Sequence, residues 1–205
     1  MTDLVILVPD KNTQFVLEGL LSRTYALKIK KIDYQIYIHP ERDPGVFNRG
    51  AEFLRPLRLQ FDKALVFLDR EGSGQENKTS EEIAQIIKDK AEKFGWQNRV
   101  EIIVFDPELE IWAWVKSPHL ARNLGWNSLA ELKSFISQNG FWDVNHPKPN
   151  RPKEAIEIAL REKHIPRSSA IYKKIAGAVN FNQCQESSFL KFKQILQNWF
   201  PALSG

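Results

Sequence analysis

The chain has 205 residues, of which 42% are hydrophobic and 26% charged, with a formal net charge of +4. This is the composition of an ordinary globular protein large enough for a full hydrophobic core. One cysteine and four histidines exclude a disulfide framework and a cysteine-rich zinc site. Since no apolar stretch is long enough for a signal peptide or a membrane span, the sequence predicts a cytoplasmic protein without membrane contact.

The net charge conceals an asymmetry along the chain. Residues 1–144 hold 19 Lys and Arg against 21 Asp and Glu, whereas residues 145–205 hold 10 against 4. A basic segment of this kind can bind the phosphates of nucleic acid, and a solvated helical face explains it about equally well. Charge alone leaves both interpretations open.

The first half of the chain alternates strand and helix patterns. Short apolar runs predict buried strands over Leu4–Val8, Ala64–Leu68 and Val100–Phe105. The alternation from Ile32 to Ile38 predicts a further strand with one more polar face, at a sheet edge or antiparallel to its neighbour.

Helical patterns separate these strands. Asn12 is predicted to cap the first helix, Val46–Leu54 forms the second, and Thr79 begins a third with the spacing of a capping box. Short strands separated by helices argue for the α/β class, with a small, mainly parallel four-stranded sheet flanked by helices.

Beyond Pro107 the pattern becomes helical. The predicted helices cover Leu109–Val115, Ser128–Asn139, Pro152–Lys163, Ser168–Val179 and Glu186–Trp199. We therefore expect an α/β domain over residues 1–142 and a basic, helical C-terminal extension over residues 143–205. The extension is expected to pack on the domain as a single structural unit.

Acidic residues follow each predicted strand, where ligands of parallel α/β sheets bind. In chain order they are Asp10, then Glu41 and Asp43, then Asp69 and Glu71, and then Asp106, Glu108 and Glu110. Carboxylate oxygens suit Mg²⁺ or Mn²⁺. Asp69 and Glu71 stand on one turn, before glycines that leave room for a phosphate.

The sequence therefore predicts a Mg²⁺ or Mn²⁺ site held by Asp10, Asp69 and Glu71. Metal ions held in this way can orient a water and stabilise the leaving oxygen in phosphodiester hydrolysis. The alternative is that the acids cap helices, which applies most strongly to Asp106.

Four further residues are candidate catalytic groups. On a helix beginning at Pro107, Glu108 shares a face with Trp112 and Glu110 lies with Trp114. An apolar, Trp-lined surface raises the pKa of a Glu beside it, so either Glu is a candidate proton donor or acceptor. His39 is a candidate base or metal ligand, with a structural, hydrogen-bonded histidine as the alternative. Lys11 is a candidate phosphate contact, with a solvated loop lysine as the alternative.

Cations of the C-terminal part are candidate phosphate contacts, supported by the helix start at Ser168. They are Lys148, Arg151, Arg167, Lys173 and Lys174. Because the sequence has no recognisable recognition helix, zinc finger or stacking ladder, it does not support the reading of specific bases.

The order of strands and acids resembles the Toprim fold of topoisomerases, primases and nucleases, whose acidic residues bind Mg²⁺. Segments across residues 4–201, among them ILVPDKN, ALVFLDREGSG and DPELEIWAW, resemble a family of small proteins from methylation-associated anti-phage defence systems of bacteria. The resemblance implies a Toprim-like fold and a role in phage defence, as a Mg²⁺-dependent nuclease or phosphodiesterase. The implied partners are nucleic acid and other components of the defence system.

The match to the Toprim motifs is uneven. Asp69 matches the first acid of Asp-x-Asp and Glu71 stands in place of the second, while Glu108 and Glu110 resemble the third acidic element. Where Toprim enzymes have a catalytic Glu directly after the first strand, this chain has Pro9 and then Asp10. Either Asp10 replaces that Glu, or the protein is a catalytically degenerate subunit that binds DNA or another defence protein.

Overall fold

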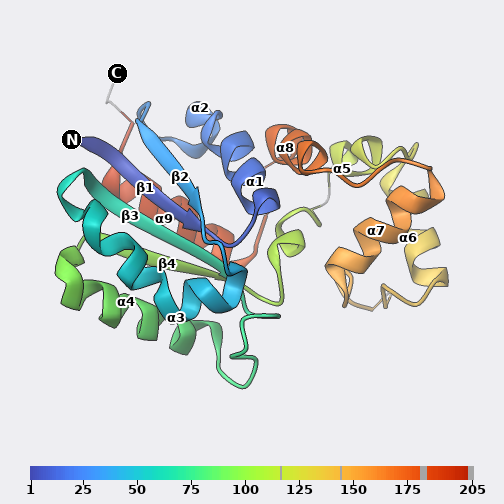
Figure 1. Ribbon diagram of the computed structural model, residues 1–205. Coiled ribbons are helices and arrows are strands. Elements are labelled where there is room, and N and C mark those ends of the chain that lie inside the picture. The colour runs from blue at the N-terminus through green and yellow to red at the C-terminus, as the bar shows by residue number, and fades with distance from the viewer. Residues whose placement is uncertain (116, 144, 181–183, 203–205) are drawn as a thin grey trace.

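A single sheet of four parallel strands forms the centre of the molecule (Figure 1). The computed structural model describes residues 1–115, 117–143, 145–180 and 184–202. The strands are β1 (Thr2–Val8), β2 (Tyr34–Ile38), β3 (Phe61–Asp69) and β4 (Val100–Phe105), in the spatial order β2-β1-β3-β4. The α/β class is confirmed, and β2 is an edge strand that runs parallel to β1. All four carboxyl ends therefore meet at one edge.

Helices cover both faces of the sheet. They are α1 (Lys11–Leu21) and α9 (Ser187–Trp199) on one face, and α3 (Arg42–Leu54) and α4 (Ser80–Ala91) on the other. Successive side chains of a strand point to opposite faces. Accordingly, Ile6 of β1 lies in the core beneath α1 and α9, and its neighbour Leu7 lies in the core beneath α3 and α4.

Four further helices form a lobe beside the carboxyl edge of the sheet, seen on the right of Figure 1. They are α5 (Pro118–Asn123), α6 (Leu129–Gln138), α7 (Pro152–Glu162) and α8 (Ser169–Ala178). Helix α8 packs along α1, and Trp114, Leu132 and Ile156 share one hydrophobic core with the sheet. Because α9 then returns to the sheet, the helical lobe is an insertion between β4 and α9.

Some helix boundaries differ from the prediction for local reasons. Asp10, and not Asn12, caps α1, since its Oδ1 accepts the backbone N–H of Thr13 at 2.8 Å. The helix predicted over Leu109–Val115 is only a 3-10 turn, Leu109–Trp112. The predicted capping box at Thr79 is confirmed.

Three short elements complete the fold. The helix α2 (Thr24–Leu27), a 3-10 helix over Arg55–Leu59 and a π-helical turn over Glu92–Trp96 lead toward β2, β3 and β4, respectively. None of the described helices combines the length and apolar character needed to cross a membrane.

Candidate functional site

The strand order fixes where a ligand crevice lies. The chain leaves β1 through α1 toward β2, whereas β3 lies on the other side of β1. Such a reversal opens a crevice beyond the carboxyl ends of the two strands. Asp10 follows β1 and Asp69 ends β3, so both predicted residues stand at this crevice.

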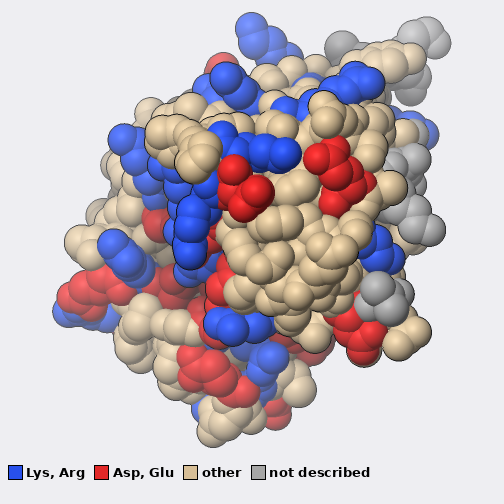
Figure 2. Space-filling view, turned by 90° about the vertical axis from the view of Figure 1, so that its right-hand side faces the viewer, with Lys and Arg blue, Asp and Glu red and all other residues tan. Residues whose placement is uncertain are grey.

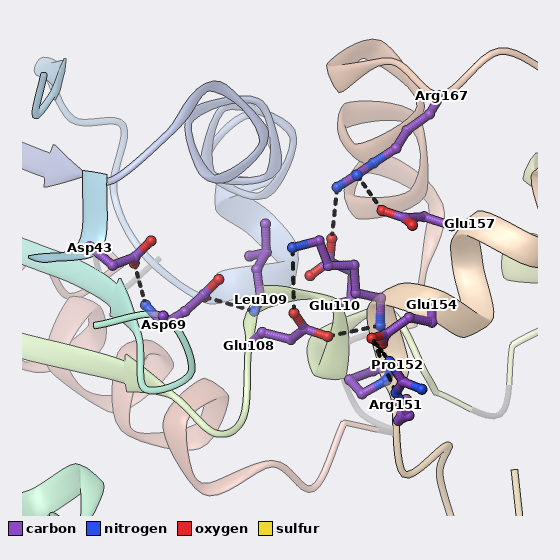
Figure 3. Close-up of polar contacts among 12 residues, drawn as sticks. Asp43, Asp69, Glu108, Leu109, Glu110, Arg151, Pro152, Glu154, Glu157 and Arg167 are labelled. Atoms are coloured by element: carbon purple, nitrogen blue, oxygen red, sulfur yellow. Dashed lines mark hydrogen bonds and ion pairs between the residues drawn. The ribbon is translucent and has the colours of Figure 1, made fainter. Parts of the chain in front are cut away.

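Asp69 is the central acid of the crevice (Figure 3). Its Oδ1 accepts the backbone N–H of Leu109 at 2.9 Å, and its own N–H donates to Oδ1 of Asp43 at 2.7 Å. Burial raises the pKa of Asp69 well above its ordinary value, and the charges of Asp43, Glu110 and Asp10 raise it further. The electrostatics therefore favour either a proton or a cation at this carboxyl group.

Asp43 is a third acid of the crevice, which was expected after a strand but not among the metal ligands. It lies in the first turn of α3, after the end of β2. Burial raises its pKa to about 6, with a further contribution from the charge of Asp10. Its position after a predicted strand was the only sequence signal that could have singled it out.

Glu108 and Glu110 continue the acidic row toward the helical lobe, as Figure 3 shows. Glu108 is buried, and its Oε1 accepts the backbone N–H of Lys153 at 2.9 Å, while the Lys153 Nζ lies 3.9 Å from Oε2. Burial raises the pKa of Glu108 to about 7, helped by the charge of Glu110. The start of α7 thus holds this carboxyl group.

Glu110 is buried as well, and the prediction that both Glu side chains stand on a helix beginning at Pro107 was wrong. Glu108 is in extended backbone, and only a short 3-10 turn follows it. Glu110 Oε1 accepts the hydroxyl hydrogen of Tyr172 at 2.6 Å and lies 3.5 Å from Nη2 of Arg167, which also pairs with Glu157. Burial raises the pKa of both Glu110 and Tyr172.

Lys153 and Tyr172 also belong to this site, and no local pattern in the sequence places them there. Both side chains come from the helical lobe, more than 40 residues after the acids they contact. Only the packing of the lobe against the carboxyl edge brings them there.

Glu71 lies in different surroundings from those of Asp69. It is exposed, its backbone N–H donates to the carbonyl of Pro107 at 3.0 Å, and its charge raises the pKa of Glu108. The following loop is closed by its own side chain, since the N–H groups of Gly72 and Gly74 donate to Oε1 of Glu76 at 2.8 and 3.2 Å. These N–H groups are therefore occupied, although the space beside the glycines is open, since a Cβ at either would meet nothing within 4 Å.

His39 and Lys11 occupy ordinary structural surroundings. His39 is buried, its ring packs against Phe53, and its Nδ1 accepts the N–H of Glu41 at 3.2 Å. Burial lowers the pKa of His39, and the positive charge of Arg49 lowers it further. Lys11 is exposed in the first turn of α1, with Nζ 5.9 Å from the ring centroid of Phe15.

Most cations predicted to contact nucleic acid are engaged in ion pairs. Lys148 pairs with Glu186, Arg151 with Glu154, Arg167 with Glu157, and Lys173 with Glu18. Lys174 is exposed and makes no ion pair with the part of the chain that the structure describes. On the face shown in Figure 2, Lys and Arg side chains lie next to Asp and Glu side chains.

The carboxylate oxygens of these acids are of the kind that divalent cations prefer as ligands. The donors at the crevice, Asp10, Asp43 and Asp69, are hard carboxylate oxygens whose mutual repulsion a cation would offset. Among the described residues, no group of three or more Asp, Glu, His or Cys side chains is arranged to hold a metal ion. An ion such as Mg²⁺, which takes one or two carboxylates and retains several waters, does not need a group of three.

Comparison with protein-family models, with curated protein sequences and with solved structures found no match. The resemblances noted in the sequence thus remain predictions.

Proposed function

We propose that this chain hydrolyses phosphodiester bonds of nucleic acid with the help of Mg²⁺ or Mn²⁺. The supporting observation is the group of carboxylates at the switch point of the parallel sheet, where burial and neighbouring charges raise the pKa of Asp69. Shifted pKa values at such a crevice are characteristic of functional sites. A divalent cation offsets this repulsion and attracts phosphate oxygens as further ligands.

Asp69 and Asp43, with Asp10 beside them, would hold the ion. When bound, the ion supplies a water of lowered pKa and stabilises developing negative charge. Glu108, whose pKa lies at about 7, takes up or releases a proton at neutral pH. Lys153, beside Glu108, supplies a cation for a phosphate oxygen.

The first test is calorimetric titration of Mg²⁺ and Mn²⁺ into the wild type, Asp69→Asn and Asp106→Asn. Asp69→Asn keeps an acceptor for the N–H of Leu109 but removes the central charge. Asp106 is an exposed acid at the same edge, paired with Arg70, and serves as the matched control. We expect saturable binding in the wild type and the control, and its loss in Asp69→Asn.

Cleavage of labelled single-stranded and duplex DNA and RNA, with and without Mn²⁺, then tests the reaction itself. We expect metal-dependent cleavage that Asp69→Asn abolishes and Asp106→Asn retains. Wild-type protein that binds no ion, or an Asp69→Asn variant that binds it equally well, would overturn the proposal.

A second candidate is a non-catalytic subunit that binds DNA or another defence protein. The observation that favours it is that Lys153 and Tyr172 already occupy oxygens of Glu108 and Glu110, so these acids fasten the helical lobe to the sheet. Under this alternative, Asp69→Asn leaves phage resistance intact in cells that carry the system. The defence role in both candidates rests on the resemblance of the sequence segments.

A further inference from the structure

The edge of the sheet opposite the acids carries positive charge. The segments that lead into β2, β3 and β4, residues 28–33, 55–63 and 92–99, hold eight Lys and Arg against three Asp and Glu. Asp3, at the start of β1, adds a fourth acid and pairs with Lys30 at 3.9 Å. The segments that leave the strands, 9–11, 39–43, 69–76 and 106–110, hold nine Asp and Glu against three Lys and Arg. The sheet is thus polarised along its strands.

Aromatic side chains connect part of this basic edge. Nζ of Lys30 lies 5.8 Å from the ring centroid of Phe200, and Nζ of Lys63 lies 5.3 Å from that of Trp199. The two rings are neighbours, with centroids 6.2 Å apart. The backbone N–H of Lys30 also donates to the carbonyl of Phe200, which fixes the end of α9 against this edge.

The other part of the edge is joined to the first by Arg99. Its guanidinium donates to the carbonyls of Arg58 and Gly95, and Nζ of Lys63 donates to the carbonyl of Asn98. Arg58 in turn donates to the carbonyl of Arg55. Cations from three separate loops therefore form one continuous band.

Exposed side chains flank this band. Lys28, Lys31 and Lys93 are exposed and make no ion pair with the described residues. Tyr25 of α2 is 96% exposed, although a tyrosine normally buries much of its ring. Its backbone carbonyl accepts the N–H of Lys28, so the ring and this cation belong to one turn.

We propose that this amino-edge surface, formed by Tyr25, Lys28, Lys31 and Lys93 around the band, binds single-stranded nucleic acid. Lysines that are free of carboxylates can neutralise phosphates. An exposed ring on the same turn as a cation offers a stacking platform for an unpaired base, which an acidic protein segment does not require. This surface lies about 20 Å from the acidic crevice, since Asp69 comes six positions after Lys63 along β3. Its residues are distinct from those of the proposed metal site.

The test is fluorescence anisotropy with a labelled oligothymidylate of about 20 nucleotides, in EDTA and at about 50 mM salt. The triple variant Lys28→Glu, Lys31→Glu, Lys93→Glu is expected to bind at least about tenfold more weakly than the wild type. The matched control reverses Arg122, Lys133 and Arg161, three cations of the helical lobe that likewise make no ion pair among the described residues. It is expected to weaken binding less than about threefold.

A second pair of variants tests stacking without a change in charge. Tyr25→Ala is expected to weaken binding about fivefold or more. Leu59→Ala, which removes a 76% exposed aliphatic side chain at the same edge, is expected to have no effect. Circular dichroism checks that each variant is folded.

Three results would overturn the inference: no binding by the wild type, equal losses in the two triple variants, or polyglutamate competing as well as the oligonucleotide. EDTA removes divalent cations, so this binding assay does not depend on the proposed metal site. A failure here is therefore distinguishable from a failure of the proposed hydrolysis.

Discussion

Glu108 shows how a single carboxyl group serves both the fold and the site. Its side chain is buried between the end of β4 and the start of α7, where it accepts the N–H of Lys153. Burial and the charge of Glu110 favour its protonated form. The contact that joins the lobe to the sheet therefore depends on pH.

We predict that the protein becomes less stable as pH rises, because the buried carboxyl group of Glu108 loses its proton. Below about pH 4.5 the group is protonated in both the folded and unfolded states, and up to about pH 7 only the folded state retains the proton. The free energy of unfolding therefore falls across this window, by at most about 3 kcal/mol from this group. It stays at its lower level above about pH 7.

The measurement is urea unfolding between pH 4.5 and 8, in EDTA, for the wild type and Glu108→Gln. The amide keeps an acceptor for Lys153 and has no charge to bury, so we expect a flatter pH profile and higher stability at pH 8. Glu52→Gln, a change of an exposed acid on α3, is the control and should follow the wild type. A Glu108→Gln profile as steep as that of the wild type would show that this group is not responsible.

At the scale of elements, the closest packing joins α1 to the lobe. A Cβ at Gly19 of α1 would lie 2.7 Å from the carbonyl oxygen of Lys173 and 3.0 Å from Cβ of Ala176, both on α8. The backbones of the two helices approach because Gly19 has no side chain. This contact holds the lobe beside the acidic crevice.

We predict that Gly19→Ala destabilises the protein by about 1–3 kcal/mol, because the methyl group forces α8 away. The matched control is Gly177→Ala in α8, where an added Cβ meets nothing within 4 Å. Since alanine favours helix more than glycine does, the control should raise stability by up to about 1 kcal/mol. Thermal unfolding measures both, and equal effects of the two variants would contradict the prediction.

Local patterns were sufficient to predict most elements. The apolar runs of β1, β3 and β4 and the capping box of α4 can be recognised from neighbouring residues alone. The short helices α2 and α5 were not predicted, because they have little periodicity to recognise.

The site was less predictable, because its contacts are long-range. The rule that acids follow parallel strands located Asp10 and Asp69 at one crevice. It could not show that Glu71 is exposed and that its charge acts on Glu108, since that depends on the course of one loop. Nor could it show that Tyr172 reaches Glu110, which requires the lobe to be in place.

At the scale of the whole molecule, the sheet and the lobe share one core. The hydrophobic cluster on the α1 face runs from β1 and β3 through Trp112 to Trp126, Leu132 and Ile156. The proposed boundary at residue 142 falls between helices that belong to this cluster. We therefore expect that neither the sheet nor the lobe is stable without the other.

We predict a single cooperative unfolding transition. Tryptophan fluorescence reports mainly on the lobe side, because Trp114, Trp126 and Trp142 are buried there. Far-ultraviolet circular dichroism reports on all helices and strands. In urea the two signals should give coincident curves. A fluorescence transition at lower urea than the dichroism transition would mean that the lobe unfolds separately.

The return of α9 to the sheet also sets an order of events during synthesis. Phe67 of β3 packs against Phe192 of α9, with ring centroids 5.6 Å apart. All four strands leave the ribosome before residues 187–199 are made, so one face of the nascent sheet lacks its covering helix until then. Exposed apolar faces of this kind attract other chains and chaperones. The acidic crevice and the basic edge thus reach their final form only after translation has passed the lobe.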